Sequence, residues 1–124
     1  TYREQLCARI GLQAVFPLWG ENTTDLANEF VRDGYRATVC CVDGQRLPSA
    51  FAGRDYDARF LTDLPEGIDP CGENGEFHTF VTAGPVLSQA VQVEVSTINE
   101  SHGFLLAELQ APRAERSQQS EVVR

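Results

Sequence analysis

The most informative absence in this sequence is lysine, because all ten of its basic residues are arginines. These residues therefore cannot supply the lysine of a phosphate-binding P-loop or a Schiff-base lysine. Basic charge of any kind is scarce, since 18 acidic residues leave a formal net charge of −8. Nucleic-acid binding needs a basic face that neutralises phosphates, so we expect no nucleic-acid partner.

Long apolar stretches are also missing. The longest is the six-residue run from Ala14 to Trp19, which Pro17 interrupts, whereas a membrane helix needs about 20 apolar residues. No basic segment precedes an apolar one in the manner of a secretory signal. The four cysteines have no zinc-site spacing. We therefore expect no membrane partner, reduced thiols and a cytoplasmic location.

The length of 124 residues and the apolar content of 42% suit a single domain. We expect this domain to cover residues 1–112, followed by a polar tail at 113–124 that is a candidate for disorder. The chain begins at Thr1, not at methionine, and already within a helical pattern. This start indicates a piece of a longer protein.

Periodic apolar residues predict three helices and several strands. The helices are expected at residues 2–10, at 22–34 with Asn22 as the N-cap and Gly34 after the end, and from about 55 to 64, with a helical turn at 47–51. The strands are expected at 14–16, 35–42, 91–98 and 104–109, the last two joined by a turn at 99–103. Residues 65–78 are expected to form a long structured loop.

These elements predict an α/β fold, with a small mixed sheet, flanking helices and a C-terminal antiparallel hairpin. The order of strand 14–16, helix 22–34 and strand 35–42 implies a parallel pair within the sheet.

The negative charge is concentrated in one region. Residues 55–76 contain seven acidic residues and one arginine, a local net charge of −6 out of −8. Residues 69–79, the acidic loop, hold three carboxylates, an imidazole, a thiol and an amide beside two glycines. A glycine-containing loop can bring side chains together that a helix or strand would spread over different faces.

Composition leaves several interpretations of the acidic loop open. The simplest is a solvated loop of turn glycines and capping carboxylates. A thiol nucleophile, Cys71 paired with His78, is chemically feasible, but nearby carboxylates disfavour a thiolate. A zinc or magnesium site is also feasible, although its candidate ligands have no diagnostic spacing. Those ligands are Asp69, Glu73, Glu76 and His78.

A resemblance narrows the choice. The stretch from Glu66 to Phe80 reads EGIDPCGENGEFHTF and resembles the signature of the diphthine-ammonia ligase family, within the N-type ATP pyrophosphatases. Three further segments match that family in the same order, and the resemblance covers roughly residues 1–85. They are Pro17-Leu18-Trp19-Gly20, Val42-Asp43 and Phe51-Ala52-Gly53-Arg54 followed by Asp57.

The resemblance implies a two-part enzyme. In that family an N-terminal half binds ATP through a Ser-Gly-Gly-Lys-Asp-Ser type loop, and the C-terminal half carries the signature. This chain is then expected to be the C-terminal, substrate-side half of an ATP-dependent amide ligase, inactive by itself. ATP, with magnesium, is expected to be bound by the N-terminal half, and this chain is expected to bind no cofactor and no metal alone.

The resemblance also implies a reaction and its partners. A carboxylate is activated as an acyl adenylate with release of pyrophosphate, and ammonia then attacks it. In archaeal and eukaryotic members the carboxylate belongs to diphthine on an elongation factor, whereas in bacterial relatives the substrate is open. The expected partners are therefore the N-terminal domain, ammonia and this substrate, and a homodimer is left open.

Residue roles follow from this chemistry. His78, or Glu76 with a raised pKa, is the candidate catalytic base that takes a proton from ammonium. The other candidates bind substrate: Asp69, Cys71, Glu73, Asn74, Trp19 and Arg54. Trp19 could stack on a methylated cation or simply pack, and Arg54 could bind the substrate carboxylate or pair with Asp57.

Two other classes of function remain. The chain could be a non-catalytic binding module that recognises a cationic ligand or partner through residues 69–79. It could also be a dimerisation domain that uses the terminal hairpin. A Ser-Gly-Gly-Lys-Asp-Ser type loop upstream in the parent gene would favour the ligase.

Overall fold

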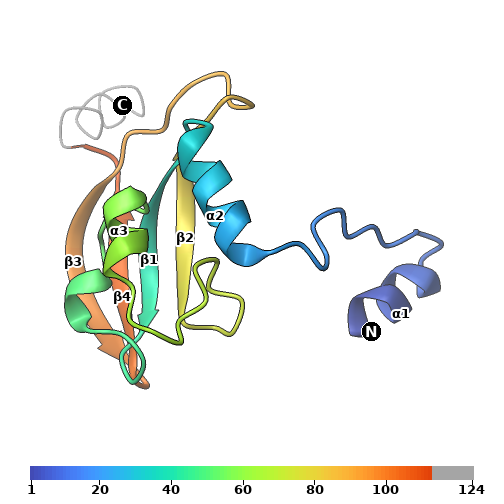
Figure 1. The fold of residues 1–124 in the computed structure, drawn as a ribbon, viewed down its shortest axis with the longest axis horizontal. Helices are drawn as coiled ribbons and strands as arrows, with labels where there is room; N and C mark the ends of the chain where they lie inside the picture. Colours follow the sequence, from blue (N-terminus) through green and yellow to red (C-terminus); the bar gives the residue numbers. More distant parts are fainter. Residues whose placement is uncertain (113–124) are drawn as a thin grey trace, which may run out of the picture.

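A four-stranded antiparallel sheet with strand order β2-β1-β4-β3 forms the centre of the computed structural model, which describes residues 1–112 (Figure 1). The strands are β1 (Arg36–Asp43), β2 (Phe77–Ala83), β3 (Glu94–Ser101) and β4 (Phe104–Gln110). The helices are α1 (Tyr2–Arg9), α2 (Thr23–Arg32) and α3 (Ala58–Asp63), with a 3₁₀ turn η1 (Ser49–Phe51). The predicted α/β class, the flanking helices and the C-terminal hairpin are confirmed. The predicted tail at 113–124 lies outside the described residues.

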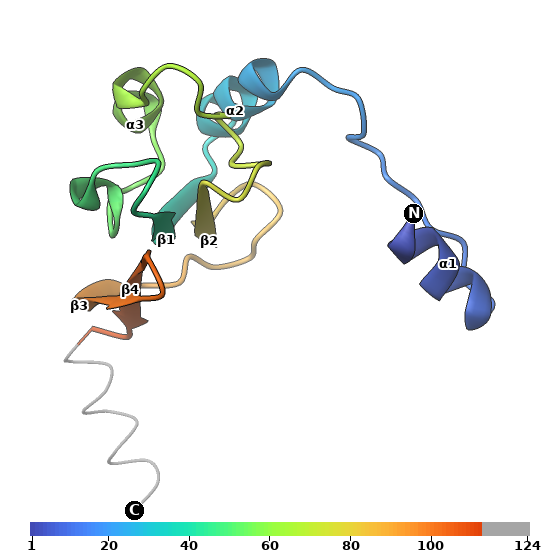
Figure 2. The same cartoon turned by 90° about the horizontal axis from the view of Figure 1, so that it is seen from below.

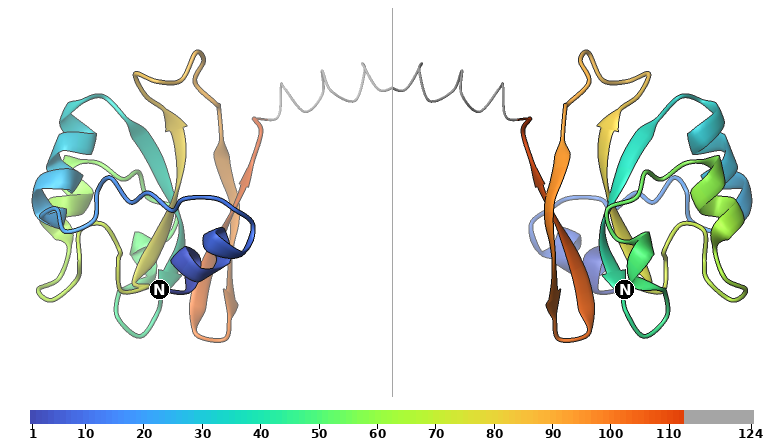
Figure 3. Two further views of the ribbon diagram at one scale, coloured as in Figure 1. Left: turned by 90° about the vertical axis from the view of Figure 1, so that its right-hand side faces the viewer. Right: turned by 90° about the vertical axis from the view of Figure 1, so that its left-hand side faces the viewer.

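The helices α2 and α3 lie on one face of the sheet, over β1 and β2 (Figures 2 and 3). The core between them is mostly aromatic. The ring of Phe60, which has no exposed surface, lies 5.2 Å from the rings of Tyr56 and Phe77 and 5.5 Å from that of Phe51. Val39 and Val42 of β1 close this core from the sheet side, and both are fully buried. β1 is therefore covered by helices along its core face.

The predicted helix at 22–34 is α2, and its local signals behave as expected. The Asn22 side chain accepts a hydrogen bond from the Asp25 N–H at 3.0 Å, which satisfies one of the free donors of the first turn. Gly34 follows the last turn with a φ of 88°, a conformation that favours glycine. Ala27 is buried on the face that contacts the sheet.

The predicted parallel strand pair is wrong, because residues 14–16 form no strand and every pairing of β1 is antiparallel. Val15 is 71% exposed, and the segment between α1 and α2 runs away from the sheet (Figure 1). Both edges of β1 are already occupied. One edge pairs with β2. On the other edge, the end of β1 pairs with β4, and the first half of β1 pairs with the backbone of residues 53–56.

Several boundaries differ from expectation. β3 begins at Glu94 and not at residue 91, and α3 begins at Ala58 and not at about residue 55. The predicted loop at 65–78 ends at residue 76, because Phe77 and His78 begin β2, a strand that the sequence analysis did not predict. The predicted turn at 99–103 shortens to His102 and Gly103, whose φ angles of 52° and 84° match a two-residue hairpin turn. β3 therefore continues to Ser101.

The N-terminal segment makes little contact with the rest of the protein. α1 begins with a capping box between Thr1 and Glu4, but none of its residues is buried. The apolar side chains of Leu12 and Leu18, further along, are 60% and 64% exposed. Within residues 1–112, no helix has both the length and the apolar character needed to cross a membrane.

The aromatic core yields a first prediction. We expect Phe60→Ala to lower the free energy of unfolding by about 3–5 kcal/mol, because it removes a fully buried ring and leaves a cavity. Phe80→Ala is the matched control: that ring is 45% exposed, so we expect a loss of about 1 kcal/mol. Urea unfolding followed by circular dichroism measures both. Equal losses for the two variants would contradict the described core.

Candidate functional site

The acidic loop, residues 69–79, connects the region after α3 to β2 and lies at the end of β1 where Val42 pairs with Phe77. Its first half is a pair of turns. The N–H of Gly72 donates to the Asp69 carbonyl at 2.9 Å, and the N–H of Gly75 donates to the Gly72 carbonyl at 3.2 Å. Both glycines have positive φ. At Gly72 a Cβ would also lie 2.7 Å from the Phe77 carbonyl oxygen, so only glycine fits there.

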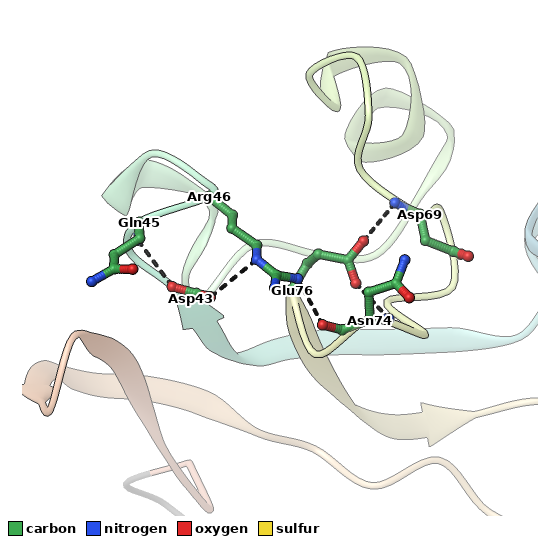
Figure 4. Close-up of polar contacts among 6 residues, drawn as sticks. All are labelled: Asp43, Gln45, Arg46, Asp69, Asn74 and Glu76. Atoms are coloured by element: carbon green, nitrogen blue, oxygen red, sulfur yellow. Dashed lines mark hydrogen bonds and ion pairs between the residues drawn. The ribbon is translucent and has the colours of Figure 1, made fainter.

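A buried carboxylate holds the loop together. Glu76 is 1% exposed, and each of its carboxylate oxygens accepts a backbone hydrogen bond of 2.7 Å (Figure 4). One donor is the N–H of Asp69 at the start of the loop, and the other is the N–H of Asn74 in its second turn. The side chain therefore joins two loop segments to the first residues of β2.

The pKa of Glu76 lies below its ordinary value of 4.5, so the predicted raised pKa is wrong. Burial alone raises this pKa, because it removes water from the charged form. Hydrogen bonds from the backbone N–H groups of Asp69, Glu76 and Asn74 lower the pKa, as does the positive charge of Arg46, and together they outweigh burial. Glu76 is thus a stable, ionised acceptor of hydrogen bonds.

Sequence reasoning missed two residues that contact this loop from outside it. Arg46 donates from Nη1 to the Asn74 carbonyl oxygen at 2.7 Å and forms an ion pair of 3.4 Å from Nε to Asp43 Oδ2 (Figure 4). Asp43 ends β1, and its N–H donates to the Glu76 carbonyl at 2.9 Å. Sequence analysis noted Asp43 only as part of a matching segment, and nothing in the local pattern marks Arg46.

Cys71 is a thiol that contributes to the loop's structure. Its Sγ donates to the Thr23 carbonyl of α2 at 3.3 Å, and its N–H donates to Asp69 Oδ1 at 2.7 Å. Burial, followed by the negative charges of Asp69 and Glu73, raises the pKa of Cys71. A thiolate is therefore disfavoured, which weakens the interpretation of Cys71 and His78 as a nucleophilic pair.

Tyr56 supports the loop from the core side. Its hydroxyl donates a hydrogen bond to the Pro70 carbonyl. Burial raises the pKa of this phenol, as do repulsion from Cys71, once that thiol ionises at high pH, and from the Asp69 carboxylate. Tyr56 stays a hydrogen-bond donor because it does not ionise at neutral pH. The loop is thus tied to α2 through Cys71 and to the aromatic core through Tyr56.

The loop borders an open depression of about 450 Å³. Its lining residues come from the loop and the start of β2: Cys71, Gly72, Glu73, Gly75, Phe77, His78 and Thr79. Glu73 and His78 are exposed, so a carboxylate and an imidazole are both available to a ligand there. Of the predicted site residues, the structure brings Cys71, Glu73 and His78 to this depression.

Trp19 and Arg54 lie outside that group. Trp19 is 83% exposed in the segment before α2, and its ring contacts Phe16 at a centroid distance of 6.2 Å. Arg54 forms an ion pair of 3.0 Å with Asp63, so the predicted pairing with Asp57 is wrong. Asp57 instead caps α3 by accepting the Phe60 N–H, which directs its carboxylate along the helix. The substrate-binding roles of Trp19 and Arg54 stay predictions.

The described residues form no candidate metal site. Within residues 1–112, no three histidine, cysteine, aspartate or glutamate side chains are gathered closely enough to hold a metal ion. All four cysteines are free thiols.

The comparison with known protein families decides the assignment. The family model of the diphthamide synthase C-terminal domain matches residues 22–110, which is well over half of the chain. The chain belongs to this family. The match begins at the N-cap of α2 and ends with β4, so the diphthamide synthase C-terminal domain corresponds to the sheet and its covering helices.

Curated relatives agree with this family. The diphthine–ammonia ligases of Bos taurus and Homo sapiens are each 30% identical over 100 residues, which is 77% of this chain and 38% of the relative. The diphthine–ammonia ligase of Schizosaccharomyces pombe is 27% identical over 95 residues, 73% of this chain and 16% of the relative. The chain thus spans about 38% of the length of the bovine and human relatives.

The buried carboxylate predicts how stability changes with pH. Because the folded pKa of Glu76 is lowered, its contribution to stability is fully present above the pKa of the unfolded chain and is lost as the pH falls through the folded value. Glu76→Gln presents an amide NH₂ to one of the two backbone N–H donors, so we expect a loss of about 3 kcal/mol at pH 7.

Denaturant unfolding between pH 7 and pH 3 measures this effect. The difference between the wild-type protein and Glu76→Gln should narrow as the pH falls below about 4.5. The control is Glu73→Gln, an exposed carboxylate in the same loop, with an expected change within about 0.5 kcal/mol. A difference that does not change with pH would contradict the role of the Glu76 charge.

Proposed function

We propose that this chain is the substrate-side part of an ATP-dependent ligase that forms an amide from a carboxylate and ammonia. The relatives' name, diphthine–ammonia ligase, supports diphthine as the carboxylate substrate. The observation that carries the proposal is the depression in which Glu73 and His78 lie together, within the family's own domain. Diphthine carries a quaternary ammonium group and ammonium is itself a cation, so the negative charge of the loop attracts the positive group of either one.

The chemistry assigned to this chain is proton transfer. Ammonium cannot attack a carbonyl carbon, because the electron pair of its nitrogen holds a proton. We assign removal of that proton to the exposed imidazole of His78. The free nitrogen then forms the bond to the carbonyl carbon of the acyl adenylate, AMP departs with the electrons of the broken carbon–oxygen bond, and the nitrogen loses a second proton to solvent to give the amide. Glu76, whose two oxygens already accept backbone N–H groups, serves in this proposal as a positioning residue.

ATP does not fit the acidic loop. The loop carries the carboxylates of Asp69, Glu73 and Glu76, which repel phosphates, and the nearby Arg46 is engaged by Asp43 and Asn74. We therefore assign ATP and magnesium to parts of the protein beyond this chain. The free cysteines fit a reducing compartment, in agreement with a cytoplasmic enzyme.

The isolated chain should bind cations and not ATP. Calorimetry with ATP and magnesium should give no measurable binding. Titration with ammonium or tetramethylammonium should shift the amide resonances of Gly72, Glu73, Gly75 and Thr79, and Glu73→Gln should weaken that response. Tight ATP binding, or cation-induced shifts confined to other parts of the chain, would contradict the proposal.

In the complete enzyme, His78→Ala should slow amide formation by about 10²–10⁴-fold, the usual contribution of a general base. Pyrophosphate release should decrease less, because it precedes the proton transfer. Cys71→Ser is the control and should be tolerated, since no step needs a thiolate. Incorporation of ¹⁵N-ammonia and release of pyrophosphate are measured separately.

The outcomes separate the competing functions. If Cys71→Ser loses activity while His78→Ala keeps full activity, the reaction depends on the thiol, and the assignment of His78 as general base is wrong. Full activity in both variants, together with cation binding by the chain, would favour the non-catalytic binding module.

A further inference from the structure

We propose that Arg46 is a positioning residue that fixes the ligand-binding conformation of the acidic loop from outside that loop, with Asp43 holding its guanidinium in place. This inference rests on the proposed function for what the loop binds, but the contacts that carry it belong to the fold. Arg46 lies 28 residues before Asn74, in the turn that follows β1.

The first observation is that the second turn of the loop is held from two sides. The N–H of Asn74 donates to Glu76 Oε1, and the carbonyl of Asn74 accepts from Arg46 Nη1, both at 2.7 Å. Two short hydrogen bonds with charged partners at one residue fix the orientation of the peptide groups on both sides of it. Glu73 lines the depression and contributes its carbonyl to the first of these peptide groups, so the position of Glu73 depends on them.

The second observation is that Arg46 is itself held. Its Nε lies 3.4 Å from Asp43 Oδ2, while the other oxygen of Asp43 accepts the Gln45 N–H at 3.0 Å. The Asp43 carboxyl group is 17% exposed, and its backbone carbonyl accepts the N–H of Arg46 at 3.0 Å. Figure 4 shows the guanidinium between this carboxylate and the loop, with the Glu76 carboxylate beside it.

The third observation is the charge arrangement. Glu76 is buried and ionised, and the positive charge of Arg46 is one of the groups that stabilise its charged form. The Arg46 side chain is 47% exposed and belongs to no part of the aromatic core. Its removal should therefore loosen the loop while the sheet and helices stay folded.

The test uses the chain with Arg46→Ala, Arg46→Lys and the control Arg59→Ala, which removes the same charge from the exposed surface of α3. We expect hydrogen exchange at the Asn74 and Asp69 amides to accelerate at least about tenfold in Arg46→Ala, and the titration midpoint of Glu76 to rise. Arg46→Lys, which keeps the charge and a donor, should restore both in part. Arg59→Ala should change neither.

Ammonium titration then tests whether the loop conformation that Arg46 holds is the one that binds the cation. In Arg46→Ala the response at Glu73 and Thr79 should weaken, with the unfolding transition within a few degrees of wild type. Unchanged exchange at Asn74 and an unchanged Glu76 midpoint would overturn the role of Arg46. If wild type shows no response to ammonium, the proposed function fails, while the exchange data still decide on Arg46. Should Arg46→Ala not fold, Asp43→Asn gives the same readouts.

Discussion

The carboxylate of Glu76 is almost completely buried, and a charge in that position is tolerated only because backbone N–H groups and a nearby guanidinium replace its water. This requirement determines the shape of the acidic loop. The chain must bring the N–H groups of Asp69 and Asn74 to the two oxygens, which needs tight turns at Gly72 and Gly75. A loop of that shape leaves a depression beside β2.

The loop therefore divides its polar groups between those that hold its structure and those that stay exposed. The carboxylates of Asp69 and Glu76 are used by backbone N–H groups, and the thiol of Cys71 is used by the Thr23 carbonyl. Glu73 and His78 stay exposed at the depression. A dense run of carboxylates in the sequence thus provides fewer ligand-binding groups than their number suggests, and the charge of the buried members acts on a ligand only at a distance.

Some of the fold could be predicted because its signals are local. α2 has a capping asparagine, an apolar stripe and a terminal glycine within one short segment, and each signal is sufficient without knowledge of the rest of the chain. The run at 14–16 misled us for the opposite reason. An apolar run indicates a strand only where another strand is available to pair with it, and in residues 1–112 no strand pairs there.

The sequence pointed to the acidic loop as the candidate site, but not to the roles that its residues have within the fold. The signature residues marked the loop, but the acceptor role of Glu76 depends on where the N–H groups of Asp69 and Asn74 lie, which is a property of the folded path. Arg46 contacts a backbone carbonyl 28 positions later, and no sequence pattern records a side chain's contact with a distant backbone atom. Residue type could not distinguish an anchoring carboxylate from one that faces a ligand.

The N-terminal segment, in which α1 has no buried residue, affects how the whole chain responds to denaturant. The dependence of unfolding free energy on urea and the heat capacity of unfolding both scale with the surface that folding buries. Residues 1–21 add length but almost no buried surface (Figure 1). The chain should therefore unfold with the urea dependence of its smaller sheet-and-helix body, and a size estimated from that dependence would fall short of 124 residues.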